Sequence, residues 1–191
     1  MKKVYLFFLL LFGFMTYGQN SYLITQKDEK IIINDNSFYI YLIDKRVGYR
    51  LPGIDWQKYV KFKDFKYFVL GEYLFKTFYI DGNKKPSAYY VLAESKNKKL
   101  VCIVKTVVKK LSSIDYVTYL ILDENDNTIL ESTFTERLND ENNEKRNEAV
   151  KMIKNHFNDC TELVKKLNEY SRSQELIIDF FIHPVYFDCK N

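Results

Sequence analysis

The feature that most constrains the fold is a change of hydrophobic period close to Leu138. Between residues 21 and 133, short segments rich in β-branched and aromatic residues alternate with turns that carry charged residues, Asn or Asp. In residues 143–157 the apolar positions recur at helical spacing instead. Strands first and helices last indicate an α+β domain in which a β-rich body, residues 19–138, carries a helical cap, residues 139–191. We predict an antiparallel β-sheet or a partly closed barrel of about 8–9 strands, followed by two or three C-terminal helices.

The turns between the expected strands contain few glycines and prolines, which number 6 and 3 in the whole chain. Pro52-Gly53 marks one turn, and we expect Trp56 behind it to close the edge of the core. Residues 67–80 are long for one strand, so Gly71 is interpreted as a bulge or bend. The other expected strands are residues 21–25, 30–34, 37–44, 58–64, 87–94, 100–108, 116–122 and 127–133.

Two further helices are expected after residue 157. Asp159 and Glu162 have the spacing of a capping box and predict a helix that begins between them. Ser173 is placed to cap a last helix over residues 174–183. This last segment is apolar almost all round, so we expect it to be covered on more than one side.

The first 18 residues have the layout of a secretory signal peptide. Lys2 and Lys3 form a basic start, and residues 4–15 carry no charge and are nearly all large and apolar. Small residues then precede a cleavage point near Gly18-Gln19. A transmembrane helix needs about 20 apolar residues, which exceeds this run, although a retained N-terminal anchor is the alternative. We predict a secreted or periplasmic chain with no transmembrane segment after signal cleavage.

Three cysteines gain importance in an oxidising compartment. We predict a disulfide between Cys160 and Cys189, which would close a loop of about 30 residues and stabilise the fold by about 3–4 kcal/mol through chain entropy. Cys102 lies in the apolar run LVCIV and is interpreted as a small buried hydrophobe. Three cysteines allow three single pairings, so the other two pairings stay open.

Charge and motifs exclude several classes of function. The formal net charge is +4 and falls to +2 when Lys2 and Lys3 leave with the signal. A balance this small argues neither for a nucleic-acid partner nor for a strongly anionic one, and we expect no nucleic acid. The phosphate-binding patterns G-x-x-x-x-G-K-[ST] and G-x-G-x-x-G and the nucleophile pattern G-x-S-x-G are absent. His156 and His183 have no further ligands at zinc-site spacing. The sequence therefore predicts no catalytic residue, no metal site and no cofactor.

Residues 123–127, DENDN, match the opening of a calcium-binding loop. The sixth position is Thr128 where such a loop needs Gly, and the twelfth is Phe134 where it needs a bidentate Glu. We therefore interpret the segment as a solvated hairpin tip. A carboxylate pair for glycoside hydrolysis stays open, because 25 acidic residues are present and the sequence does not show which lie close together.

One surface feature points to ligand binding. Residues 58–67 alternate lysines with aromatic residues, and such a strip could hold an anionic polymer through cation–π and stacking contacts. The alternative is that the lysines blunt an exposed sheet edge. The candidate binding strip consists of Lys58, Tyr59, Lys61, Phe62, Lys63, Phe65, Lys66 and Tyr67.

The chain also resembles a group of uncharacterised secreted proteins of Bacteroidota. The resemblance rests on Gln just after the expected cleavage point and on the runs YLFKTFYIDGNKK, YYVL, YVTYLILDENDNTI and NDCTELVKKL. In that group a β-rich body precedes a helix that ends near D-C-x-E-L, as residues 159–163 do in this chain. The resemblance covers residues 60–189 and implies the fold and the compartment, but no catalytic residue.

The leading hypothesis is an extracytoplasmic, non-catalytic cell-envelope domain that binds a polymer or a protein partner. The first alternative is an inhibitor or immunity protein against a secreted toxin or hydrolase, which the small size and the absence of a catalytic constellation suit equally well. The second alternative is a hydrolase that uses a carboxylate pair.

Overall fold

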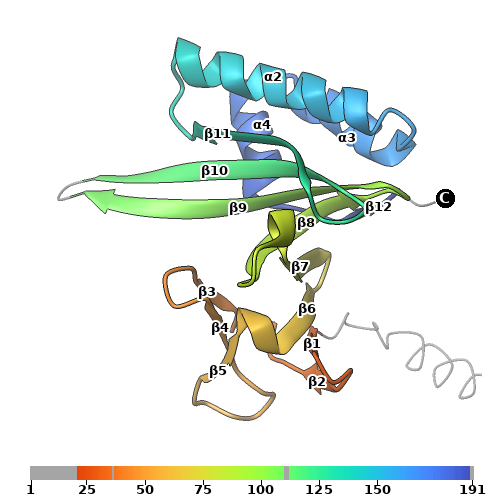
Figure 1. Cartoon of the computed structure of the whole chain (residues 1–191). Coiled ribbons are helices and arrows are strands. Elements are labelled where there is room, and N and C mark those ends of the chain that lie inside the picture. Colours follow the sequence, from red (N-terminus) through yellow and green to blue (C-terminus); the bar gives the residue numbers. More distant parts are fainter. Residues whose placement is uncertain (1–20, 36, 110–111, 190–191) are drawn as a thin grey trace, which may run out of the picture.

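The computed structural model describes residues 21–35, 37–109 and 112–189 and shows an α+β fold (Figure 1). The predicted signal peptide, residues 1–18, lies outside the described residues. The described strands of the large sheet do not close into a barrel, so the open-sheet form of the prediction is confirmed. The antiparallel order is β11-β10-β9-β8-β7-β6-β1-β2, and β12 pairs in parallel with β8. The strands are β1 (Tyr22–Thr25), β2 (Lys30–Ile32), β6 (Phe65–Leu70), β7 (Tyr73–Phe78), β8 (Ser87–Glu94), β9 (Lys98–Lys109), β10 (Ser112–Asp123), β11 (Thr128–Thr135) and β12 (Phe187–Asp188).

A separate small sheet has the order β3-β4-β5. Its strands are β3 (Tyr39–Tyr41), β4 (Arg46–Tyr49) and β5 (Lys58–Lys61), and the 3₁₀ turn η1 (Phe62–Asp64) leads from β5 into β6. The predicted strand at 37–44 is therefore too long, and β4 was missed. The chain turns back at Lys45, which has φ of +47° and donates its backbone N–H to the carbonyl of Leu42. The turn begins with the apolar residues Leu42 and Ile43 and contains no Gly or Pro, so the sequence pattern continued the strand through it.

The predicted long strand over residues 67–80 is two strands, β6 and β7. They form a tight hairpin in which Leu70 pairs with Tyr73, and Gly71 has φ of +60° between them. A two-residue turn that begins with a positive φ favours Gly at that position, because Gly carries no Cβ. Gly71 is therefore the centre of a turn and not a bulge within one strand.

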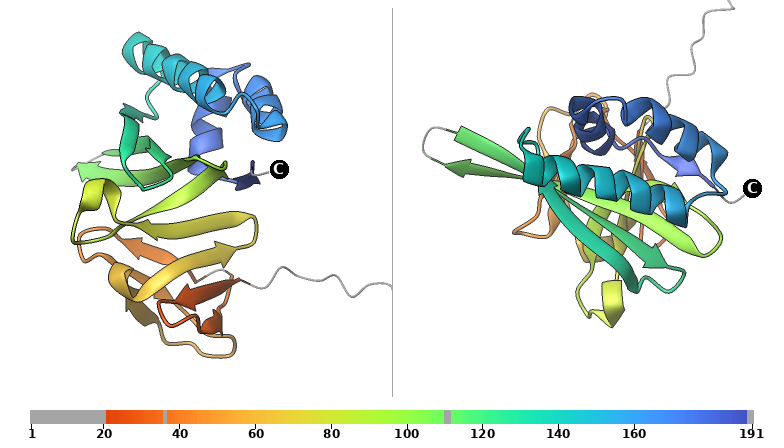
Figure 2. Two further views of the ribbon diagram at one scale, coloured as in Figure 1. Left: turned by 45° about the vertical axis from the view of Figure 1, so that its right-hand side comes forward. Right: turned by 90° about the horizontal axis from the view of Figure 1, so that it is seen from above.

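Apolar side chains form two main cores. The helices and the small sheet, which cover them, lie at opposite ends of the molecule (Figure 2). One core lies between the helices and β8–β11 and includes Tyr119 and Phe134. The other lies between the small sheet and β1, β6 and β7 and includes Phe68 and Phe75. Tyr90 borders both cores. The small sheet thus buries one face and leaves the other face free.

Three C-terminal helices cover the sheet, namely α2 (Asp140–His156), α3 (Thr161–Tyr170) and α4 (Gln174–Ile182). The Ser173 side chain accepts a hydrogen bond from the backbone N–H of Leu176, which confirms the predicted cap of α4. The predicted capping box at Asp159 is wrong. Cys160 occupies the N-cap position of α3 without a side-chain cap bond, and its backbone is held there by a cross-link to Cys189. None of the helices in the described ranges is both long and apolar enough to cross a bilayer.

The C-terminus is fastened to the sheet and to α3. The Sγ atoms of Cys160 and Cys189 lie 1.98 Å apart, at disulfide-bond distance. The backbone N–H of Cys189 donates to the carbonyl of Glu94 at 2.8 Å, next to the β12–β8 pairing. Cys102 is free and fully buried. The described cysteines therefore adopt the arrangement that the sequence favoured.

Candidate functional site

The predicted basic-aromatic strip is divided between two sheets. Its first residues belong to β5 of the small sheet and its last residues to β6 of the large sheet, with η1 between them. The turn directs Phe62 and Phe65 into the core, where they are 3 % and 0 % exposed. Their rings meet edge to face with centroids 6.2 Å apart. These two rings stabilise the interior and present no face to a ligand.

The part of the strip on β6 is engaged in contacts within the chain. The Nζ atom of Lys66 forms an ion pair with Asp28 at 2.6 Å. The ring of Tyr67 packs edge to face against Tyr22, with centroids 6.5 Å apart. The exposed members of the strip are Lys58, Tyr59, Lys61 and Lys63.

The free face of the small sheet carries an aromatic row that the strip did not include. Cross-strand partners share a face of a sheet, and the register pairs Gly48 with both Tyr39 and Tyr59. Both tyrosines are 49 % exposed. A Cβ on Gly48 would lie 2.2 Å from Nε2 of Gln57, so the glycine allows this amide to lie across the sheet between the two rings. The Tyr59 hydroxyl donates to Oε1 of Gln57 at 3.1 Å.

The next row of the same face is built around Arg46. The register places Tyr41 and Lys61 on either side of it. The guanidinium carbon lies 5.2 Å from the Tyr41 ring centroid and 4.5 Å from the Tyr59 ring centroid, within the range of cation–π contacts. An ion pair of 3.0 Å to Asp44 fixes the guanidinium further. The face therefore offers exposed tyrosine rings around a positioned positive charge.

A basic hollow of about 490 Å³ adjoins this face. Lys61 and Lys63 line it together with Lys45 and Lys85. Asp44 is the single acidic residue among its lining residues, and the Asp44 carboxylate already pairs with the arginine of the aromatic face. A concave surface lined by one sign of charge concentrates the electric field and attracts oppositely charged ligands.

Two large apolar side chains in the segment between β3 and β5 are exposed. Ile43, at the tip of the β3–β4 hairpin, is 97 % exposed, and Trp56 is 67 % exposed. The prediction that Trp56 closes the edge of the core is wrong, because Leu51 packs against that core in its place. Apolar groups beside lysines and tyrosines give this end of the molecule the mixed chemistry of a binding surface.

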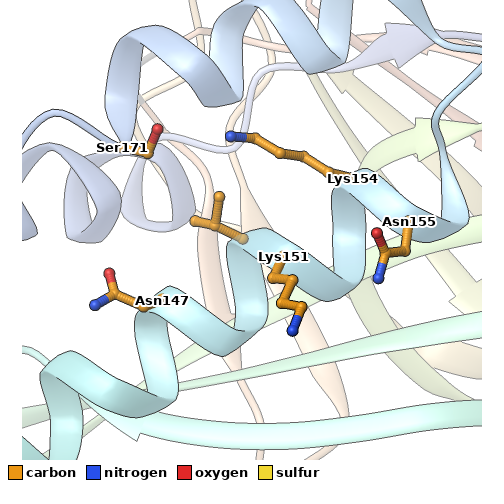
Figure 3. A pocket seen from close by; sticks show the side chains of 6 residues that line it. Asn147, Lys151, Lys154, Asn155 and Ser171 are labelled. Carbon is orange, nitrogen blue, oxygen red and sulfur yellow. The ribbon is translucent and has the colours of Figure 1, made fainter.

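A second basic hollow, of about 340 Å³, lies between α2 and α3 (Figure 3). Figure 3 shows that Lys154 extends toward the side of Ser171, whereas Lys151 points away from it. Because these side chains diverge, they do not present several charges to one ligand. The hollow at the small sheet is the better candidate.

The buried carboxylate of Glu94 does not provide a hydrolytic site. Its Oε1 atom pairs with Nζ of Lys76 at 2.6 Å, and the Tyr186 hydroxyl donates to its Oε2 atom at 3.4 Å. Burial is the largest cause that raises the pKa of Tyr186, and the nearby carboxylates of Glu94 and Asp188 raise it further. Asp188 is the register partner of Glu94, but neither acid lines the hollow beside Tyr186. The cluster is a buried polar link between β8 and the C-terminal segment.

Other candidate chemistry is accounted for locally. Burial raises the pKa of the Cys102 thiol, which makes it a poor nucleophile. The hairpin tip after β10 is held by contacts within the chain. The carboxylate of Asp123 accepts hydrogen bonds from the backbone N–H groups of Asn125 and Asn127 at 2.8 Å, and Lys99 of β9 forms an ion pair with Asp126. In the ranges that the structure describes, no three His, Cys, Asp or Glu side chains are grouped to hold a metal ion.

Sequence reasoning found part of the site and missed the rest. Lys61 and Lys63 were in the predicted strip, whereas Tyr39, Tyr41 and Arg46 were not. The alternation Y-I-Y followed by R-V-G-Y was the available signal for the second group. No family model, curated protein or solved structure matches this chain. The function is therefore argued from the geometry of the site.

Proposed function

We propose that this chain is an extracytoplasmic, non-catalytic domain of the cell envelope that binds an anionic polymer at the small sheet. The observation that carries the proposal is the convergence of four lysines on one hollow beside the tyrosine face around Arg46. The predicted signal peptide and the cross-linked Cys160 and Cys189 support the location outside the cytoplasm.

The arrangement favours a polymer over a small anion. Lys61 lies in the hollow and also in the aromatic rows of the sheet, so the two surfaces are continuous. A chain with repeated negative charges can contact several lysines at once, and flat rings beside them can stack on sugar units. With Asp44 as its single acid, the hollow lacks the two carboxylates that glycoside hydrolysis requires.

The binding test compares two sets of charge reversals. A triple variant with Lys61→Glu, Lys63→Glu and Lys85→Glu changes the basic hollow, and Lys151→Glu with Lys154→Glu changes the helical hollow as a control. Titration calorimetry with polygalacturonate, a linear uronic-acid polymer, should show binding to the unaltered protein that weakens with added salt. We expect the triple variant to bind at least about tenfold more weakly, which corresponds to about 1.4 kcal/mol.

If the triple variant and the control lost polygalacturonate affinity equally, overall charge would explain the binding, and this would contradict the proposed site. Binding of uncharged dextran as tight as that of polygalacturonate would contradict the anionic ligand. The compartment needs a separate test, in which cells are fractionated and the N-terminus of the purified chain is sequenced. We expect the chain outside the cytoplasm with Gln19 as its first residue, and a cytoplasmic chain that retains Met1 would contradict the proposal.

A further inference from the structure

The distal half of β9 has a free edge. Strand β8 pairs with β9 as far as Cys102, whereas β10 continues along the other edge to the partners Ser112 and Lys109. From Ile103 onward, β9 has no register partner on the edge toward β8 among the described strands. The β9–β10 hairpin projects beyond its neighbours at this end (Figures 1 and 2).

A second free edge faces it across a hollow of about 490 Å³. Strand β3 is the outer strand of the small sheet and pairs with β4 alone among the described strands. The hollow is lined by the consecutive residues Ile40–Asp44 on one side and by Val104–Thr106 on the other. Because side chains alternate between the faces of a strand, consecutive residues line a hollow when it runs along the strand edge. The hollow therefore lies between the free edge of β9 on one side and, on the other, the end of β3 with the turn residues 42–44 that follow it.

The free edge of β9 carries lysine, which is one usual protection against pairing, but it has neither of the two devices that interrupt a strand. Natural edge strands are commonly interrupted by Pro or by a bulge. Residues 103–109 contain no Pro, and their register with β10 continues without a shift. Val108 on this stretch is 80 % exposed. Lys105 is the charged residue on the wall of the hollow that β9 supplies. The edge is regular, partly apolar and accessible.

We propose that an extended segment of a partner protein binds in this hollow as an added strand on β9, with β3 as the opposite wall. A polypeptide backbone supplies donors and acceptors at the spacing that a strand edge requires, which sugars and lipids do not. The apolar side chains of Ile40, Leu42 and Val104 fit apolar residues of the segment, and Lys105 fits an acidic residue between them. The preferred segment therefore alternates apolar and acidic residues.

The hollow beside β9 is separate from the proposed polymer site. The two hollows share Ile43 and Asp44 at the tip of the β3–β4 hairpin, but different lysines line them. Lys61, Lys63 and Lys85 line the polymer hollow, and Lys105 lines the peptide hollow. Each activity can therefore be removed separately.

The probe is an octapeptide of alternating Val and Glu, added to isotope-labelled protein and followed by NMR. We expect slower exchange at those amides within Ile103–Thr106 that point to the free edge, and backbone contacts between the peptide and this stretch. A peptide N-methylated at alternate residues keeps its side chains but loses backbone donors, so it should bind at least about tenfold more weakly. Lys105→Glu should weaken binding of the unmethylated peptide by a similar factor, whereas Lys165→Glu, an exposed charge reversal on α3, should not.

Absence of binding at about 1 mM peptide, equal binding of the methylated peptide, or protection confined to other strands would overturn the inference. The triple variant of the polymer hollow should still bind the peptide. Loss of polygalacturonate binding with intact peptide binding would refute the proposed function alone, and the reverse result would refute the peptide site alone.

Discussion

Replacing Arg146 by Met should destabilise the fold by about 3 kcal/mol. The side chain is fully buried at 0 % exposure, and its guanidinium joins β11, α2 and α4. It donates to the carbonyl oxygens of Thr135 at 2.6 Å and Arg137 at 3.2 Å. It also donates to Oε1 of Gln174 at 2.9 Å and to the amide oxygen of Asn143. Burial lowers the pKa of this guanidinium, yet it stays charged at neutral pH.

The expected loss of unfolding free energy depends on whether each acceptor of Arg146 finds another hydrogen-bond partner. A hydrogen bond from a charged donor contributes about 1.5–3 kcal/mol, and the short bond to Thr135 counts in full. The carbonyl of Arg137 also accepts the backbone N–H of Asn139 at 3.1 Å, so it keeps a partner. The two amide acceptors are half-buried and can turn to water. Loss of the guanidinium contact over Phe134, at 5.9 Å from its centroid, adds about 0.5–1 kcal/mol.

Urea unfolding followed by far-UV circular dichroism measures the change, because Trp56 is exposed and its fluorescence would report the core poorly. Lys145→Met is the matched control. It changes the neighbouring residue of the same helix, whose ion pair with Glu141 is exposed, and should cost less than about 0.5 kcal/mol. A loss below about 1 kcal/mol for Arg146→Met would show that the arginine is not the link between these elements.

Two further predictions concern the C-terminal cross-link and the hairpin tip. Replacing both Cys160 and Cys189 by Ser opens a loop of sequence separation 29 and should lower the free energy of unfolding by about 3–4 kcal/mol, measured by urea unfolding. Unchanged stability would contradict a formed disulfide. Two hydrogen bonds lower the pKa of Asp123 below its usual 3.8, the larger effect coming from the Asn127 side chain and the smaller from the Asn127 backbone N–H. The charged carboxylate therefore stabilises the tip above pH 3.8, and this stabilisation is lost as pH falls through the lowered pKa. In an NMR titration, Asn127→Ala should move the Asp123 midpoint upward, and an unchanged midpoint would contradict the assigned cause.

The segments whose pattern is local were predicted well. Residues 87–94 match β8, and residues 100–108 and 116–122 lie inside β9 and β10, because Val, Ile and Tyr dominate these strands and polar turns separate them. The turn at Lys45 was missed because Leu42 and Ile43 continue the apolar pattern of the preceding strand, and no Gly or Pro marks the reversal. Gly71 was misassigned because a single Gly within a strand pattern fits a bulge as well as a turn. Strand β12 is two residues long and owes its place to pairing with β8, which no local pattern reports.

The residues of the predicted binding strip do not share one surface, for a related reason. Alternation over residues 58–67 suggested one face, but alternation identifies a face only while the chain stays extended. The turn η1 interrupts it, so Phe62 and Phe65 enter the core that joins the two sheets. The tyrosines of β3 could not be added to the site from the sequence, because their place beside Arg46 depends on the register with a strand that was not predicted.

The basic hollow depends on contacts between distant parts of the chain, and this limits what any sequence pattern can report about it. Lys45 comes from the β3–β4 turn, Lys61 and Lys63 from β5 and η1, and Lys85 from the loop before β8. The Nζ atom of Lys45 donates to the carbonyl of Pro86 at 3.4 Å across a separation of 41 residues, which brings the first and the last of these segments together. The sequence around each lysine could not predict this convergence, because each lysine taken alone resembles any other surface lysine. Packing of the small sheet against the large one therefore determines whether these charges act together.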